Sequence, residues 1–211
     1  MMKINSLNEF AEAFHQFLEQ KPEPSKIEQE GLKLLQALLR VPDLLNDTLT
    51  RLVLDEAFLK SQWLSIDANE IVLYRSPDKS FSVRVYIWEP QVTYPIHDHG
   101  AWGLVGGYIN RFRERKYARV DDGQTENHAE IKLIAEGEFN PGETSVVRPL
   151  NEGIHQMGVA GDQAAVTIHV YGAPIRKGYI QNFNPHNQSV HRVYAPQLYK
   201  QALAIRALGS I

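Results

Sequence analysis

Cysteine is absent from the 211 residues of this sequence. Disulfide bonds, thiolate metal ligands and a cysteine nucleophile are therefore excluded together. Any metal site in this chain must rely on nitrogen and oxygen ligands or on the thioether sulfur of its 3 methionines. The 8 histidines are consequently the first residues to examine.

Long apolar runs and clusters of positive charge are absent too. No run approaches the ~20 apolar residues that cross a bilayer, and the amphipathic pattern after Met1 does not resemble a secretory signal. We therefore expect a cytoplasmic protein without a membrane partner. The formal net charge is -3 and no segment is rich in lysine and arginine, so the footprint of a nucleic-acid binder is missing. Small-molecule substrates are favoured over polymers.

The composition is that of a folded protein, with 43% hydrophobic and 22% charged residues. The length fits one ordinary domain with a sizeable core. We expect one structural domain, in which a helical region over residues 1–60 packs on a barrel. The barrel, with an irregular C-terminal extension, is expected over residues 61–211.

The first third of the chain has the spacing of short helices. Two capping-box patterns, Ser6 with Glu9 and Ser25 with Glu28, each precede apolar residues that recur at helical intervals. A third, less regular pattern runs towards Phe58. Beyond residue 61 the apolar period drops to two, and short runs of β-branched and aromatic residues alternate with turn residues. These runs predict strands over 71–74, 81–88, 104–113, 130–135, 145–148 and 164–171, and a closing helix is expected over 197–208. Many short strands favour a β-sandwich or jelly-roll barrel.

Two histidines stand close together in the β region. His97 and His99 lie two residues apart in an extended segment, so their side chains point to the same side and can chelate one metal ion. Chance occurrence on a solvated face is the alternative for an isolated pair. His155 follows a turn rich in proline, asparagine and glycine, and the interval after His99 leaves room for strands that return it to the pair. Taken alone, His155 would be a hydrogen-bonded surface or core histidine.

Three neutral imidazoles suit iron, nickel, copper or zinc, and a facial set of three leaves adjacent coordination positions open. Without a carboxylate or thiolate ligand the site keeps the full +2 charge of the metal. We therefore expect it to attract an anionic ligand, for which a soft thiolate is well suited, with dioxygen alongside.

The segment over residues 165–171 alternates strictly in polarity. Thr167, His169 and Tyr171 point to one face, and apolar residues point to the other. These three side chains can form a relay that orients the phenol towards a metal-bound ligand. The alternatives are a surface strand whose polar side faces water, and His169 as a fourth metal ligand.

Together these residues resemble the cysteine dioxygenase family of thiol dioxygenases, which belongs to the cupin superfamily. The resemblance covers about residues 70–174, half of the chain, and is carried by Pro-Ile-His-Asp-His-Gly-Ala-Trp-Gly at 95–103, by His155 and by the 167–171 segment. It implies a mainly β cupin double-stranded β-helix, a jelly-roll barrel, with the helical region at its N-terminal side. It also implies iron(II), Fe(2+), held by His97, His99 and His155. Most cupins add a glutamate ligand shortly after the first two histidines, and its absence here favours the three-histidine iron site.

The resemblance assigns further roles. Thr167, His169 and Tyr171 are the implied catalytic relay, although threonine stands where serine is usual and no cysteine is present to link covalently to the tyrosine. Arg75 is the implied ligand of the substrate carboxylate, with an ordinary exposed arginine as the alternative. In the related mercaptopropionate dioxygenases an arginine after the relay tyrosine has that role, which makes Arg176 the other candidate.

The function expected from the sequence is that of a non-haem iron(II) thiol dioxygenase, an enzyme that adds both atoms of O2 to the sulfur of a small thiol. Cysteine is the favoured substrate and 3-mercaptopropionate the alternative. A non-redox cupin that binds a metal or small molecule for sensing or storage is a hypothesis from another class. A zinc- or manganese-dependent sugar isomerase is least favoured, because such cupins tend to need the missing glutamate.

Overall fold

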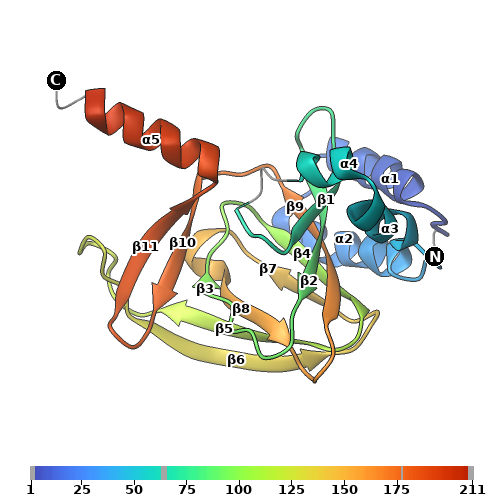
Figure 1. Ribbon diagram of the computed structural model, residues 1–211. Coiled ribbons are helices and arrows are strands. Elements are labelled where there is room, and N and C mark those ends of the chain that lie inside the picture. The colour runs from blue at the N-terminus through green and yellow to red at the C-terminus, as the bar shows by residue number, and fades with distance from the viewer. Residues whose placement is uncertain (1–2, 63–65, 177, 209–211) are drawn as a thin grey trace.

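The computed structural model describes residues 3–62, 66–176 and 178–208. Two antiparallel sheets face each other, and helices near the N-terminus pack against one of them (Figure 1). The strands are β1 (Glu70–Arg75), β2 (Phe81–Trp88), β3 (Ile96–His97), β4 (Gly103–Ile109), β5 (Phe112–Arg119), β6 (Ile131–Phe139), β7 (Thr144–Val147), β8 (Ile154–Val159), β9 (Ala165–Gly172), β10 (Tyr179–Asn184) and β11 (Ser189–Tyr194). The helices are α1 (Leu7–Glu19), α2 (Pro24–Leu38), α3 (Asn46–Leu54), α4 (Glu56–Ser61), α5 (Pro196–Leu208) and the short 3-10 helix η1 (Leu150–Gly153).

The strand order identifies the architecture. One sheet has the order β1-β2-β9-β4-β7 and the other β11-β10-β3-β8-β5-β6. The strands pair in nested fashion, β2 with β9, β3 with β8 and β4 with β7, around the consecutive pair β5 and β6. This is the wrapped pairing of a jelly roll, the double-stranded β-helix. The predicted mainly β class with N-terminal helices is therefore confirmed.

The outer face of β2 is apolar and lies beneath the helices. Phe81, Val83 and Val85 alternate along β2 and join the same buried cluster as Phe10 and Phe14 of α1. The opposite face of β2 points between the two sheets, because side chains alternate across a strand. The alternation therefore separates a structural core under the helices from the barrel interior.

The helix boundaries differ from the prediction in two places. α2 begins at Pro24, with Glu23 rather than Ser25 as its N-cap, because proline is well tolerated in the first turn. The expected third helix is divided into α3 and α4 at Asp55, whose side chain accepts a hydrogen bond from the Phe58 N–H and so begins a new helix. Helix α5 confirms the expected closing helix and extends away from the barrel (Figure 1).

Two strand predictions are also corrected. The run over 104–113 is two strands, β4 and β5, because the chain turns at Asn110, whose φ of 54° is in the left-handed region. The segment after residue 175, predicted to be irregular, forms the β10–β11 hairpin that extends the second sheet next to β3. In the described residues, no helix combines the length and the apolar character required to cross a membrane.

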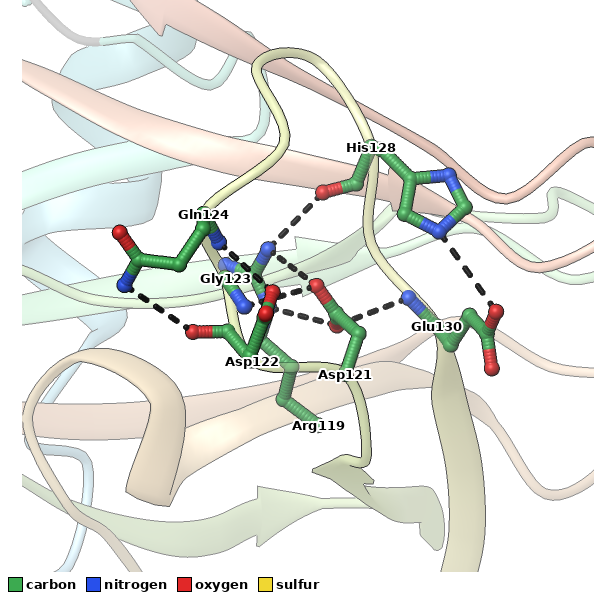
Figure 2. A network of polar contacts seen from close by, with 7 residues as sticks. All are labelled: Arg119, Asp121, Asp122, Gly123, Gln124, His128 and Glu130. Carbon is green, nitrogen blue, oxygen red and sulfur yellow. Dashed lines mark hydrogen bonds and ion pairs between the residues drawn. The ribbon is translucent and has the colours of Figure 1, made fainter.

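The loop between β5 and β6 is ordered by a compact polar network (Figure 2). The Arg119 guanidinium donates two hydrogen bonds to the Asp121 carboxylate, at 2.8 and 2.9 Å, and one to the His128 carbonyl at 2.8 Å. Asp121 also accepts the backbone N–H groups of Gly123 and Glu130. The hydrogen bonds from Arg119 lower the pKa of the Asp121 carboxyl. The network fixes one end of the barrel and contains none of the predicted site residues.

Candidate metal centre

Two strands of the second sheet bring the three predicted histidines together. His97 on β3 lies opposite His155 on β8 in the antiparallel register, and His99 follows His97 by two residues. One nitrogen from each ring lies within 4.8 Å of the other two. The Nε2 atoms of His99 and His155 are 2.9 Å apart, close to the ~3 Å between two cis ligands with metal bonds of ~2.1 Å. The three side chains therefore fit a single metal ion.

Hydrogen bonds select the nitrogen that each ring offers. His97 Nδ1 lies 3.1 Å from the Pro95 carbonyl oxygen, which can only accept, so this nitrogen carries the proton. His155 Nδ1 lies 2.7 Å from Glu114 Oε1 and is protonated for the same reason. In both rings Nε2 is left with its lone pair directed towards the centre. These bonds fix the tautomers that a metal requires.

Burial keeps two rings of the cluster, those of His97 and His99, uncharged. Burial and the neighbouring His155 lower the pKa of His97 to about 3. Burial also lowers the pKa of His99 well below its ordinary value, with further contributions from His97 and His155. Neutral imidazoles are the metal-binding form, so these two rings need lose no proton to bind a metal at neutral pH.

A buried carboxylate that the sequence analysis missed supports His155. Glu114 on β5 is 2% exposed and accepts hydrogen bonds from His155 and from Ser145 Oγ, the latter at 2.5 Å. Lys116 Nζ lies 3.6 Å from its second oxygen. Burial raises the pKa of Glu114, but the hydrogen bond and charge of His155, with Lys116 and Ser145, lower it more, and the net shift is downward. The Glu114 carboxylate thus contacts the outer nitrogen of the His155 ring and is not itself a member of the histidine cluster.

A second buried ion pair orients the other two histidines. Asp98, between His97 and His99, is fully buried, and its carboxylate accepts hydrogen bonds from both terminal nitrogens of Arg176 and from the Gln181 N–H. Asp98 points away from its neighbours along the extended chain, so fixing it directs both imidazoles to the opposite side. Both terminal nitrogens of the Arg176 guanidinium are therefore occupied by Asp98.

Thr167, His169 and Tyr171 form a continuous hydrogen-bonded row on β9. Thr167 Oγ1 lies 2.8 Å from His169 Nε2, and His169 Nδ1 lies 2.8 Å from the Tyr171 hydroxyl. β9 is a central strand between β2 and β4 and is buried along its whole length, which excludes the surface-strand alternative. The Tyr171 ring stacks on that of His99, with centroids 5.0 Å apart. The row therefore ends beside the histidine cluster, and His169 is not one of the three residues of that cluster.

A cavity of about 30 Å³ lies between the histidine cluster and this row. Its walls include His97, His155 and Tyr171, and Asp67 and Tyr86 also contribute to its lining. Burial raises the pKa of Asp67 to about 6, with a further contribution from Glu70. Tyr171 remains a neutral phenol at physiological pH, because burial raises its pKa.

Two arginine side chains on β1 and β2 have different positions relative to this cavity. Arg75 is exposed at the end of β1, opposite Ser82, and does not line this cavity. Arg84, on the inward face of β2, was not singled out from the sequence. Its guanidinium lies 5.4 Å from the Tyr171 ring centroid and 2.9 Å from the Glu70 carboxylate. Polar residues alternate with apolar ones along β2, and this alternation was the sequence signal that the side chain at position 84 faces inward.

No family model matches the chain. Among solved structures it is similar to a cupin 2 conserved barrel domain protein from Salinispora arenicola, at 19% identity over 52% of this chain and 80% of that one, with a TM-score of 0.36. It is also similar to an RmlC-like cupin protein from Ralstonia eutropha, at 8% identity over 69% of this chain and 79% of that one, with a TM-score of 0.38. A third, the DMSP lyase DddQ from Ruegeria pomeroyi, matches at 13% identity over 44% of this chain and 38% of the lyase, with a TM-score of 0.32. At these low scores the fold assignment depends on the strand order of the chain itself.

Proposed function

We propose that the protein is a non-haem iron(II) thiol dioxygenase that converts a small thiol, most favourably cysteine, to its sulfinic acid. The observation that carries the proposal is the row ending at Tyr171, which faces a cluster of three histidines that, in the described part of the chain, includes no carboxylate. The reaction is balanced as RSH + O2 → RSO2H, so no second reductant is required. When bound, iron(II) supplies positions at which thiolate sulfur and dioxygen meet.

The side chains of this chain have separate tasks in that reaction. His97, His99 and His155 would bind the metal, and Glu114 keeps the His155 ring in the required tautomer and orientation. Tyr171 presents a neutral hydroxyl beside the metal site, and the small lined cavity limits water around the reacting sulfur. These tasks are positioning and proton handling, which are the usual contributions of a protein to cofactor chemistry.

We propose Arg75 as the group that binds the substrate carboxylate. Arg75 pairs with Ser82 across β1 and β2, so it belongs to the same face as Ser82 and Arg84. Arginine suits this task because its planar guanidinium binds a carboxylate through two parallel hydrogen bonds. Arg176 is the less favourable candidate, since Asp98 already occupies both of its terminal nitrogens.

The proposal is tested with iron(II)-loaded protein and a panel of cysteine, 3-mercaptopropionate and cysteamine. We expect oxygen consumption with a stoichiometric sulfinate product for one of these thiols. In H155A we expect both the oxygen consumption and the retention of metal to be lost. The matched control is H186A, which truncates an exposed histidine outside the cluster. Metal retention without thiol-dependent oxygen consumption would favour a non-redox sensor or storage cupin. Unimpaired turnover in H155A would overturn the assignment of the site.

A further inference from the structure

Asn182 on β10 lies beside the histidine cluster, in line with two of its members. In the antiparallel register His155 on β8 is opposite His97 on β3, and His97 is opposite Asn182 (Figure 1). Residues directly opposite each other in an antiparallel pair share a face of the sheet. Gln181, the preceding residue, lies on the other face, where its side chain accepts a hydrogen bond from Arg176. Asn182 therefore points with the two histidines into the small cavity, and all three line it.

The Asn182 side chain brings a buried acceptor without a donor. In the described residues only two buried side-chain nitrogen or oxygen atoms lack a hydrogen-bond partner, and one of them is Asn182 Oδ1. Such an atom is costly to bury, and a ligand that completes it gains a hydrogen bond without breaking another. An amide oxygen can only accept, so the matching group on the ligand must carry an N–H or O–H bond.

The charge on the cavity wall selects between these donors. Among the described residues that line the cavity, Asp67 is the one carboxylate, and no lysine or arginine is present. Burial raises the pKa of Asp67 to about 6, so the carboxyl is mostly ionised above pH 7. A donor that also carries positive charge suits both Asn182 and Asp67. A primary ammonium group has three N–H donors and one positive charge.

A larger cleft adjoins the cavity and has charge of the same sign. Its volume is about 950 Å³, and it shares Asp67, Asn69 and Tyr94 with the cavity. Its other carboxylates are those of Glu70 and Glu89, and the described lining residues again include no lysine or arginine. The charge of Glu70 is compensated by an arginine on β2. A ligand that enters through this cleft therefore passes carboxylates and no cation, which favours a ligand with an ammonium group.

We infer that Asn182 and Asp67 form a binding site for a primary ammonium group beside the histidine cluster. Asn182 Oδ1 accepts one of its N–H bonds, and Asp67 compensates its charge. Resting on the proposed function, this site makes the substrate a small aminothiol and disfavours thiols whose second group is only a carboxylate. The cavity of about 30 Å³ has room for about two groups of the size of water, which suits a sulfur and a nitrogen separated by a short carbon chain.

The ammonium site can be tested in metal-free protein, without any turnover. The probe is methylammonium chloride, and sodium formate, an anion of similar size, is the comparison. The side-chain amide resonance of Asn182 is assigned in 15N spectra by its absence from N182L. We expect methylammonium to shift this resonance in a saturable way and formate to leave it in place. No saturable shift with methylammonium, or an equal shift with formate, would overturn the inference.

The contribution of Asp67 is measured in the same titration. D67N keeps the size of the side chain and removes its charge. The midpoint of the methylammonium titration should rise about threefold in D67N, as expected for loss of one partly exposed ion pair. N8L, which replaces an exposed asparagine on α1, is the matched control and should titrate like the wild type. An unchanged midpoint in D67N would contradict the inference.

Selectivity among thiols tests the site in iron(II)-loaded protein. We expect kcat/KM for cysteamine or cysteine to exceed that for 3-mercaptopropionate, which has no amine, by about tenfold. N182L keeps a side chain of similar size without the acceptor, and it should raise KM for cysteamine about tenfold with little effect on KM for 3-mercaptopropionate. N182D retains an acceptor and should keep the preference for the amine. A wild-type preference for 3-mercaptopropionate, or an unaltered KM for cysteamine in N182L, would overturn the inference.

Metal affinity separates substrate binding from metal ligation. N182L should bind iron(II) as tightly as the wild type in competition with a colorimetric chelator, because Asn182 contacts the substrate and not the metal. A loss of iron binding as large as that in H155A would overturn the inference. If wild-type protein has no thiol-dependent activity, the proposed function fails, while the methylammonium titration still decides the ammonium site.

Discussion

Glu114 and His155 form a fully buried hydrogen bond of 2.7 Å that joins a carboxylate on β5 to a candidate metal ligand on β8. Strands β5 and β8 pair directly, so the register of the sheet, and not a loop, positions the two side chains. A carboxylate in this place fixes the imidazole and increases its basicity as a ligand. The pair is therefore expected to control metal affinity.

Replacing Glu114 with glutamine should weaken iron(II) binding roughly 10- to 100-fold, the range usual for loss of such a partner. The amide retains an acceptor oxygen but removes the negative charge. Competition with a colorimetric chelator measures the affinity. E136Q, which neutralises an exposed glutamate on the adjacent β6, is the matched control and should bind iron like the wild type. Equal affinities for E114Q and wild type would show that this carboxylate does not support the site.

Removing the charge of Asp98 should destabilise the metal-free protein by about 3 kcal/mol, because it leaves Arg176 partly buried without its partner. Urea unfolding of D98N measures the free energy. The double variant D98N/R176Q is expected to recover part of that loss, since the unpaired guanidinium is gone. Strictly additive losses would contradict a coupled pair.

Acidification should destabilise the metal-free protein between pH 7 and pH 5. The pKa of His97 is about 3 in the folded chain and 6.5 ordinarily, so below pH 6.5 the unfolded chain binds a proton that the folded chain does not. The contribution is fully present above pH 6.5 and decreases towards pH 3. The loss at pH 5 amounts to about 2 kcal/mol, and His99 and His169 act in the same direction. Denaturant unfolding at the two pH values provides the check, and greater stability at pH 5 would contradict the assignment.

Asp67 opposes this trend and supplies a control. Its pKa is raised from 3.8 to about 6, so the folded chain binds the extra proton between these values and acidification there favours folding. D67N removes that contribution. We expect a steeper loss of stability between pH 7 and pH 5 in D67N than in the wild type. Parallel curves for the two proteins would show that Asp67 titrates normally.

Substrate recognition distinguishes Arg75 from its neighbour Arg84 on the same face of the sheet. If Arg75 binds the carboxylate, R75A should raise KM for cysteine at least tenfold and leave KM for cysteamine, which has no carboxylate, nearly unchanged. Steady-state oxygen consumption measures both values. An R75A enzyme with unaltered KM for cysteine would exclude this role, and the same comparison in R84A would then show whether Arg84 has it.

Much of the fold follows from short-range patterns in the sequence. The alternation in β2 and β9 and the helical spacing before residue 61 each reflect a face that must be buried, so both elements and faces are predictable. The β10–β11 hairpin was missed because its strands are only partly buried and lack a clear apolar alternation. The chain reversal at Asn110 was missed because it requires only one left-handed residue.

The site was predictable only where its residues are neighbours in sequence. The His97–His99 spacing and the row on β9 are local patterns, and they predicted side chains that the fold brings face to face. Glu114, Glu70 and Arg84 come from other strands, and their proximity results from register between strands that one sequence does not specify. The ion pair between Asp98 and Arg176 has the same origin, since it joins the metal-binding segment to the approach to β10.

We propose that the protein transfers both atoms of one dioxygen molecule to the sulfur of a thiol. Turnover of iron(II)-loaded protein under 18O2, followed by mass spectrometry of the sulfinate, is the direct test. We expect a product in which both sulfinate oxygens carry the label, formed by the wild type and not by H155A. A product without label or with one labelled oxygen, or no oxidised product from any small thiol, would contradict it.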